Sequence, residues 1–211
     1  TDCCTSNNIA KSGNRVYVSV GNQIQIYDVS NPVSPTILGA YTAASDVLSL
    51  ASFGNYLMAG VNYAYSYPAY IPANVQIIDA STAGSPRVVY TTTSLNSKFF
   101  MVVSGTVGYF DDGYLKAIDL SNPQSPIISS SLGFAASYAL AIDKNILYAG
   151  LYGGSVLGVY DISSATAPKL VTYQVCDCEI TNITVEDSQL FLATKELGVL
   201  YMRWADKVDA N

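Results

Sequence analysis

The stretch Asp28-Val29-Ser30-Asn31-Pro32-Val33-Ser34-Pro35 decides the organisation of this chain, because its frame returns three more times. In every copy a Ser follows the Asp by two positions and a Pro follows it by seven. The fixed positions are Asp28, Ser30, Pro35, Asp79, Ser81, Pro86, Asp119, Ser121, Pro126, Asp161, Ser163 and Pro168. A motif that recurs every few tens of residues is typical of solenoids, propellers and other repeat proteins.

The repeat divides the whole chain into similar pieces. Successive Asp residues are 51, 40 and 42 positions apart, and a fifth, degraded copy surrounds Arg203, 42 positions after Asp161. The repeats therefore cover about 1–42, 43–94, 95–134, 135–175 and 176–211. A chain of 211 residues with such repeats is expected to form one domain over residues 1–211.

Each repeat contains four short apolar runs separated by turn residues. In the second repeat these runs are 47–52, 56–61, 75–78 and 88–93, rich in Val, Ile, Leu and Tyr and separated by Gly, Asn, Asp and Pro. Such runs predict antiparallel strands. Four strands in about 42 residues, repeated five times, predict an all-β, five-bladed β-propeller. Few residues follow Trp204, so the last blade is expected to be incomplete.

The strand ends carry a resemblance to a known family. Ile24-Gln25-Ile26-Tyr27-Asp28 and Val75-Gln76-Ile77-Ile78-Asp79, each followed by the Ser and Pro of the repeat, resemble the LVIVD-repeat β-propellers of microbial cell-surface and secreted proteins. The resemblance covers nearly the whole chain. It implies a propeller fold and an extracellular setting, and no reaction.

The composition excludes several functions. The net charge is −6, with 10 basic and 16 acidic residues and no basic run, which argues against nucleic acid. There is no His to serve as a general base or metal ligand. The long uncharged span 47–78 is broken by Gly54, Pro68 and Pro72, so the chain is not expected to span a membrane. The first four residues do not resemble a signal peptide, so a secreted protein would have its mature end there.

The chain contains few charged residues. Only 12% of residues are charged, against roughly 25% in ordinary soluble domains, and 50% are hydrophobic. One interpretation is a sheet protein covered by Ser, Thr, Asn and Tyr. The other is that much of the outside is buried against further copies of the chain.

The repeated Asp and Ser are interpreted as structural. An Asp at a strand end accepts hydrogen bonds from the amides of the following turn, and the Pro starts the outer strand without an amide. The alternative makes the four Asp residues metal ligands around a ring. We expect no metal or other cofactor.

The four cysteines lie at the two ends of the chain, at Cys3, Cys4, Cys176 and Cys178. Their positions match in the first and last repeats, so bridges between the two pairs could fasten a closed ring. An even number of cysteines without the usual spacing of zinc ligands favours disulfides and an oxidising compartment. A four-Cys zinc site is the alternative, and the sequence leaves the connectivity open.

The second repeat contains an insertion rich in tyrosine, with Tyr63, Tyr65, Tyr67 and Tyr70 within eight positions. The alternation is consistent with the two faces of a hairpin. Tyrosine also offers large, stiff and amphipathic contact area, so these four residues are the candidate partner-binding site, for another protein or a sugar.

Other residues are weaker candidates. Asp46 and Glu179 precede innermost strands, where a glycosidase would place its acid and base. Asp111-Asp112-Gly113 is interpreted as a solvated turn in preference to a calcium site. Asn182 begins an Asn-Ile-Thr sequon that accepts N-glycan in a host that glycosylates.

The sequence therefore predicts a non-enzymatic extracellular or cell-surface propeller that acts by contact. Its partners are expected to be copies of itself, in a filament or surface layer, or other surface proteins. The alternatives are a carbohydrate-binding propeller and a glycoside-active enzyme that uses Asp46 and Glu179.

Overall fold

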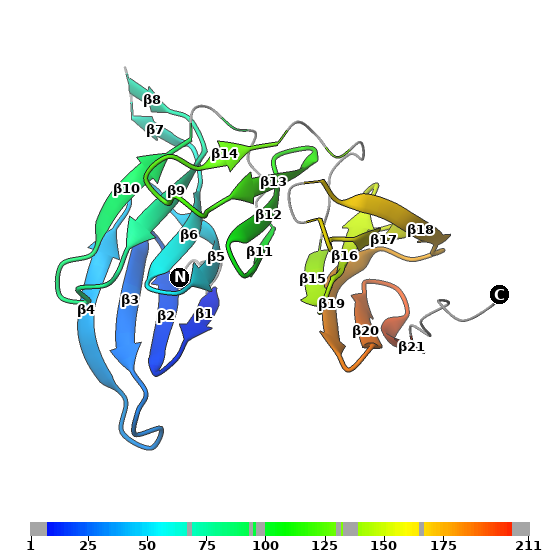
Figure 1. Ribbon diagram of the computed structural model, residues 1–211, viewed down its shortest axis with the longest axis horizontal. Coiled ribbons are helices and arrows are strands. Elements are labelled where there is room, and N and C mark those ends of the chain that lie inside the picture. Colours follow the sequence, from blue (N-terminus) through cyan, green and yellow to red (C-terminus); the bar gives the residue numbers. More distant parts are fainter. Residues whose placement is uncertain are drawn as a thin grey trace. The chain divides into compact units, whose positions relative to one another are not determined.

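The computed structural model describes residues 8–66, 69–92, 95, 100–129, 132, 139–164 and 167–203 of the chain. Within these residues the regular elements are strands joined by turns. Most belong to five sheets that follow one another along the sequence, which we call blades 1 to 5 (Figure 1). Each repeat found in the sequence contains one blade.

The blades are built from consecutive strands. Blade 1 contains β1 (Ile9–Ser12), β2 (Arg15–Val20), β3 (Gln23–Asp28) and β4 (Thr36–Thr42). Blade 2 contains β5 (Val47–Phe53), β6 (Tyr56–Val61), β9 (Asn74–Asp79) and β10 (Arg87–Thr91). Blade 3 contains β11 (Met101–Ser104), β12 (Val107–Asp111), β13 (Leu115–Asp119) and β14 (Ile127–Ile128). Blade 4 contains β15 (Ala139–Asp143), β16 (Ile146–Leu151), β17 (Val156–Asp161) and β18 (Lys169–Val175). Blade 5 contains β19 (Ile180–Glu186), β20 (Gln189–Thr194) and β21 (Gly198–Arg203).

These sheets confirm the all-β prediction and fit the predicted number of blades. The paired strands run antiparallel, as β16 does between β15 and β17. Closure of the blades into a ring stays a prediction. The remaining strands, β7 (Ala64–Ser66) and β8 (Ala69–Ile71), form a separate hairpin inserted between β6 and β9.

The chain divides into two compact units, residues 1–112 with 118–128 and residues 113–117 with 129–211. The single domain expected over residues 1–211 stays a prediction. Unit 1 has one apolar core between blades 1 and 2, where Tyr17 and Leu57 are buried, and a second between blades 2 and 3 around Met58 and Phe110. Unit 2 has a core between blades 4 and 5 around Tyr148 and Ile180.

Neighbouring blades pack through their first strands. In unit 1, β5 lies against both β1 and β11, and in unit 2, β15 lies against β19. Polar contacts cross the same interface: the Ser12 hydroxyl donates to the Gly54 carbonyl over 2.8 Å, and the Ser52 hydroxyl donates to the Lys11 carbonyl over 2.9 Å. Successive first strands side by side are the arrangement expected of propeller blades.

The repeated Asp forms the same turn in all four blades that carry it. Oδ1 of Asp28, Asp79, Asp119 and Asp161 accepts a hydrogen bond from the backbone amide of the Ser two positions on, over 2.7, 2.9, 2.9 and 2.8 Å. An ionised carboxylate that accepts an amide is favoured over its neutral form. Hydrogen bonds from the Ser amide and hydroxyl accordingly lower the pKa of each of these carboxyls.

The rest of the turn is also repeated. A tight turn follows each Asp. In blade 1 it is closed by a 3.1 Å hydrogen bond from the Ser34 amide to the Asn31 carbonyl. The Pro of the motif immediately precedes the fourth strand. Three positions after the Pro, Leu38, Val89 and Val171 are bulged residues in the fourth strands of blades 1, 2 and 4. The motif thus positions the outer strand, and the long turn before β4 projects from blade 1 in Figure 1.

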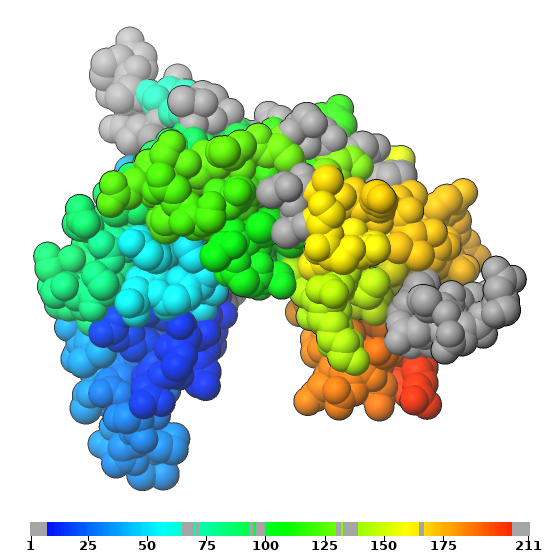
Figure 2. Space-filling view, in the orientation of Figure 1, coloured from blue at the N-terminus to red at the C-terminus, as the bar shows by residue number. Residues whose placement is uncertain are grey.

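Blade 5 has one strand fewer than the others among the described residues. Its last strand, β21, pairs with β20 along one edge, and neither Asp nor Pro of the motif follows it. β21 lies at the surface of unit 2, as the red segment in Figure 2 shows, and Val199 and Tyr201 on it are 69% and 58% exposed.

Replacing Gly39 with Ala is expected to destabilise unit 1. A Cβ at Gly39 in β4 would overlap the Ala83 carbonyl in the blade 2 turn, and backbone atoms move less readily than side chains. Overpacking of this kind costs about 1–3 kcal/mol, measurable by urea unfolding. Gly84→Ala is the matched control, since its Cβ would meet only the Leu38 carbonyl at 3.7 Å, and an effect as large as that of Gly39→Ala would contradict the account.

Asp119→Asn tests the charge in the repeated turn. The pKa of Asp119 is lower in the folded protein than its ordinary value of 3.8, so the ionised carboxylate stabilises the fold at pH values above 3.8. This stabilisation is lost as the pH falls through the lowered pKa of the folded state. We expect the variant, which keeps an oxygen acceptor, to unfold at lower urea concentration than the wild type at pH 7. The gap should close in strongly acidic buffer, and a gap independent of pH would show that the charge has no role.

Candidate functional site

The two ends of each blade differ. At one end, which we call the repeat end, lie the hairpin turns between first and second strands and the Asp turns. At the opposite end, the variable end, lie the turns between second and third strands and the loops leading to the next blade. Because neighbouring strands are antiparallel, successive loops alternate between the two ends of the sheet, and each set of loops stays at its own end. The Asp turns look alike from blade to blade, whereas the variable end carries the tyrosine insertion, Asp46, Glu179 and the cysteine pair.

The tyrosine insertion of blade 2 is the hairpin β7–β8, in which Tyr65 lies opposite Tyr70. Tyr63 directly precedes β7, and Tyr70 lies in the middle of β8. Tyr67 lies outside the described residues. The structure therefore brings two of the four predicted tyrosines, Tyr63 and Tyr70, together.

Two of these rings contact each other at the surface. The ring centroids of Tyr63 and Tyr70 are 6.4 Å apart with planes tilted by 33°, and the residues are 49% and 59% exposed. The Tyr63 carbonyl accepts a 3.1 Å hydrogen bond from the Ser45 hydroxyl, which fixes the hairpin to the loop that enters blade 2. An exposed aromatic pair on a fixed hairpin provides contact area with little further loss of entropy on binding.

The two carboxylates considered for catalysis lie just before first strands, Asp46 before β5 and Glu179 before β19. They belong to different units. Among the described residues no group of three or more His, Cys, Asp or Glu side chains lies close enough to hold a metal ion.

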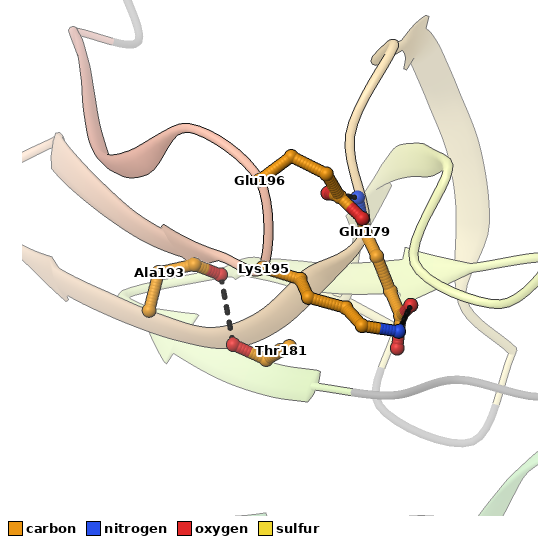
Figure 3. Close-up of polar contacts among 5 residues, drawn as sticks. All are labelled: Glu179, Thr181, Ala193, Lys195 and Glu196. Atoms are coloured by element: carbon orange, nitrogen blue, oxygen red, sulfur yellow. Dashed lines mark hydrogen bonds and ion pairs between the residues drawn. The ribbon is translucent and has the colours of Figure 1, made fainter.

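Glu179 is held by contacts within blade 5 (Figure 3). Its carboxylate pairs with Nζ of Lys195 at 3.0 Å, and its backbone amide donates to Oε2 of Glu196 over 2.8 Å. The hydrogen bond and charge of Glu179 raise the pKa of Lys195. The Thr181 hydroxyl donates to the Ala193 carbonyl over 3.1 Å beside this cluster. These contacts connect the start of β19 to the turn after β20, which is a structural role.

Cys176 and Cys178 form a disulfide with each other, with their Cα atoms 5.1 Å apart. Cys3 and Cys4 lie outside the described residues. This pairing differs from the bridge between the chain ends that the sequence suggested, because each sulfur forms one bond and Cys178 is already joined to Cys176. The short cross-link lies in the loop that leads from β18 to β19.

Two other sequence interpretations gain a structural setting. Asp111 and Asp112 are 0% and 5% exposed, so the interpretation of a solvated turn is wrong. Asn182, the candidate glycan acceptor, is exposed on β19, and its Oδ1 accepts a 2.8 Å hydrogen bond from the Ile183 amide.

No helix in the described part of the chain is long and apolar enough to cross a membrane.

Sequence reasoning missed the exposed apolar face of blade 5, formed by Phe191, Ala193, Val199 and Tyr201. The Phe191 and Tyr201 rings lie 5.4 Å apart on it. The sequence shows only apolar residues at these positions, as in every other blade. Their exposure is visible in the structure alone.

Solved structures similar to this chain have low sequence identity to it. The computationally designed Ika8 protein has a TM-score of 0.69 at 16% identity, over 93% of this chain and 57% of that one. A functionally unknown protein from Desulfotomaculum acetoxidans DSM 771 has a TM-score of 0.65 at 9% identity, over 91% of this chain and 66% of that one. A chain of a nidogen/laminin complex has a TM-score of 0.64 at 12% identity, over 93% and 75%. The chain thus spans just over half to three quarters of the length of these proteins, which share its fold.

The comparison with curated proteins gives no match. The family model described as LVIVD repeat matches residues 5–43 and 102–133, which contain the Asp turns of blades 1 and 3. The LVIVD repeat recognised from the strand ends is thereby confirmed in these two regions.

Proposed function

We propose that this chain is a non-enzymatic, extracellular structural propeller protein that assembles with copies of itself. The observation that carries the proposal is the open edge of blade 5. β21 has a paired neighbour only in β20, among the described residues, whereas β3, β9, β13 and β17 at the same place in the other blades each have a fourth strand beside them.

An open edge of this kind favours pairing with another chain. Amides and carbonyls that have no strand partner among residues 8–203 as described are a template for a further strand. Natural edge strands usually carry charge or Pro that prevents such pairing. β21 has the sequence Gly-Val-Leu-Tyr-Met-Arg, with its single charge at the last position. It therefore lacks the usual protection against association.

Other features support the same function. Only 12% of residues are charged, so extensive surface could be buried between copies without a large cost of desolvating charge. A disulfide between Cys176 and Cys178 fits an oxidising compartment outside the cell. The Asp turns are occupied with backbone hydrogen bonds, which favours a structural role for the repeat over a ring of metal ligands.

We expect the purified protein to associate as its concentration rises. Sedimentation velocity and negative-stain microscopy should show oligomers or filaments that dissociate on dilution, under non-reducing conditions. A protein that stays monomeric at the highest attainable concentration would contradict self-assembly. Urea unfolding curves measured on the same samples distinguish assembly of the folded protein from aggregation of misfolded chains.

A second candidate function, binding of carbohydrate, is favoured by the exposed pair Tyr63 and Tyr70. Neutral aromatic faces suit the apolar faces of sugar rings, and no charged residue lies between 47 and 78 to bind ions in their place. The predicted partner site would then lie on the face of the β7–β8 hairpin that carries the tyrosines.

Removal of both rings tests this candidate. A glycan array should identify a ligand for the wild type, and Tyr63→Ala with Tyr70→Ala should weaken its binding about tenfold or more, because stacked aromatic contacts are worth about 1 kcal/mol each. The double Phe variant, which keeps the rings, is the control and should retain most of the affinity. Absence of any glycan ligand, or equal binding by the Ala and Phe variants, would contradict the candidate.

A further inference from the structure

The disulfide between Cys176 and Cys178 closes a very short loop, in which Asp177 alone lies between the two cysteines. In the chain-entropy account a cross-link stabilises a fold by restricting the unfolded chain, and it contributes less as the loop that it closes becomes shorter. The bridge also lies entirely within the connector between β18, which ends at Val175, and β19, which begins at Ile180. It therefore joins no elements that are distant in the sequence, and it adds little to the stability of the fold.

Unit 1 contains the same kind of connector without cysteines. Residues 43–46 lead from β4 to β5, and residues 176–179 lead from β18 to β19, so the two connectors have the same length. Ala43 and Ser45 hold the places of Cys176 and Cys178. The connector of unit 1 thus shows what this segment does when no disulfide is present.

Both connectors are held by the same three backbone hydrogen bonds, each from an amide to a carbonyl. In the first connector they run from Ala43 to Asn22, from Val47 to Gly21 and from Asn62 to Asp46, over 2.8, 2.9 and 2.9 Å. In the second they run from Cys176 to Ser155, from Ile180 to Gly154 and from Lys195 to Glu179, over 2.9, 3.0 and 3.0 Å. The backbone therefore adopts this arrangement without a disulfide, and the bridge is not needed to build it.

The two cysteines differ in their accessibility. Cys176 is half-buried beside the exposed Asp177, whereas Cys178 is 6% exposed and belongs to the core of unit 2. Because access decides which sulfur of a disulfide is attacked, an external thiolate reaches Sγ of Cys176. A reduced Cys178 suits its place, since a free cysteine packs in a core as a small apolar side chain. Both the bridged and the reduced forms are thus compatible with the fold.

We propose that the Cys176–Cys178 bridge is a site of thiol–disulfide exchange, whose substrate is a thiol that carries a positive charge. The substrate thiolate bonds to Sγ of Cys176, the bond between the two cysteines breaks, and its electron pair goes to Sγ of Cys178, which takes up a proton. A second substrate thiolate then attacks the substrate sulfur of this mixed disulfide and releases Cys176, which also takes up a proton. Two thiols leave as one disulfide, and the protein gains two electrons and two protons. This activity goes beyond the proposed assembly and does not depend on it.

The charge of the substrate follows from the side chains around the connector. Asp177 is exposed between the cysteines, and Glu179 directly follows Cys178. The Glu179 amide donates to Oε2 of Glu196 over 2.8 Å, and the Glu179 carboxylate pairs with Nζ of Lys195 at 3.0 Å (Figure 3). Three acidic side chains thus accompany one basic side chain. An excess of negative charge attracts a cationic thiol and repels an anionic one.

Alkylation of the folded protein tests the exchange. The wild type is equilibrated without urea in redox buffers of cysteamine and cystamine, then alkylated, and the modified cysteines are identified by peptide mass mapping, which distinguishes them from Cys3 and Cys4. Cys176 and Cys178 should both become alkylated while the protein stays folded. A bridge that is reduced only at urea concentrations that unfold the protein would overturn the proposal.

The double variant Cys176→Ala with Cys178→Ala tests whether the bridge is dispensable for the fold. It should keep the urea midpoint of the oxidised wild type, because the connector of unit 1 forms its hydrogen bonds without cysteines. A large fall in the midpoint would show a structural bridge and contradict the exchange site. Mixed disulfide trapped by acid after brief exposure to cysteamine should map to Cys176, and trapping on Cys178 would overturn the choice of the attacked sulfur.

Reduction rates with two small thiols test the charge preference. Cysteamine carries an ammonium and 3-mercaptopropionate a carboxylate, and each rate is divided by the rate with hydroxyethyl disulfide to remove differences in intrinsic nucleophilicity. At low salt, cysteamine should react about fivefold faster by this measure, and Asp177→Asn or high salt should narrow the difference. Glu186→Gln, which removes an exposed charge at the other end of β19, is the matched control and should leave it unchanged. Equal corrected rates with the wild type would overturn the preference for a cationic thiol.

Discussion

The structure depends on one constraint: a blade with apolar residues on both faces needs a neighbour on each side. β6 in blade 2 and β16 in blade 4 meet it, since they are buried on both faces. The clusters around Tyr17 and Leu57, and around Tyr148 and Ile180, consist of side chains from two successive blades. Burial of such side chains is the main favourable term in folding, so a single blade would not be stable alone.

The Asp turn serves this constraint from the repeat end. Its carboxylate organises the turn, and the Pro that follows starts the outer strand at a fixed distance from the third strand. The motif therefore sets the width of a blade and leaves the variable end open to change. The tyrosine hairpin, the Glu179–Lys195 pair and the Cys176–Cys178 bridge all occur at that end, where an insertion does not disturb the sheets.

Local features could be predicted from the sequence, and features that depend on distant neighbours could not. The strand ends predicted for blade 2 from its apolar runs lie within about two residues of the observed ends of β5, β6, β9 and β10. This prediction succeeded because alternating apolar residues and turn residues act locally. The tyrosine insertion was predicted to be a hairpin, and the structure forms that hairpin with Tyr63 and Tyr70 in contact. The sequence did not reveal that Cys178 pairs within its own loop, since matching repeat positions suggested a partner at the other end. Nor did it reveal the burial of Asp111 and Asp112 or the exposure of Phe191, because burial depends on residues distant in the sequence.

The central claim is that successive blades are stable because they bury each other's apolar faces, and amide hydrogen exchange of the native protein tests it most directly. Amides of β6 and β16, which are buried on both faces, should exchange only when their whole unit unfolds, while those of the exposed outer strand β18 should exchange faster. Exchange of β6 and β16 as fast as that of β18 would contradict the account, because it would show that a blade opens independently of its neighbours.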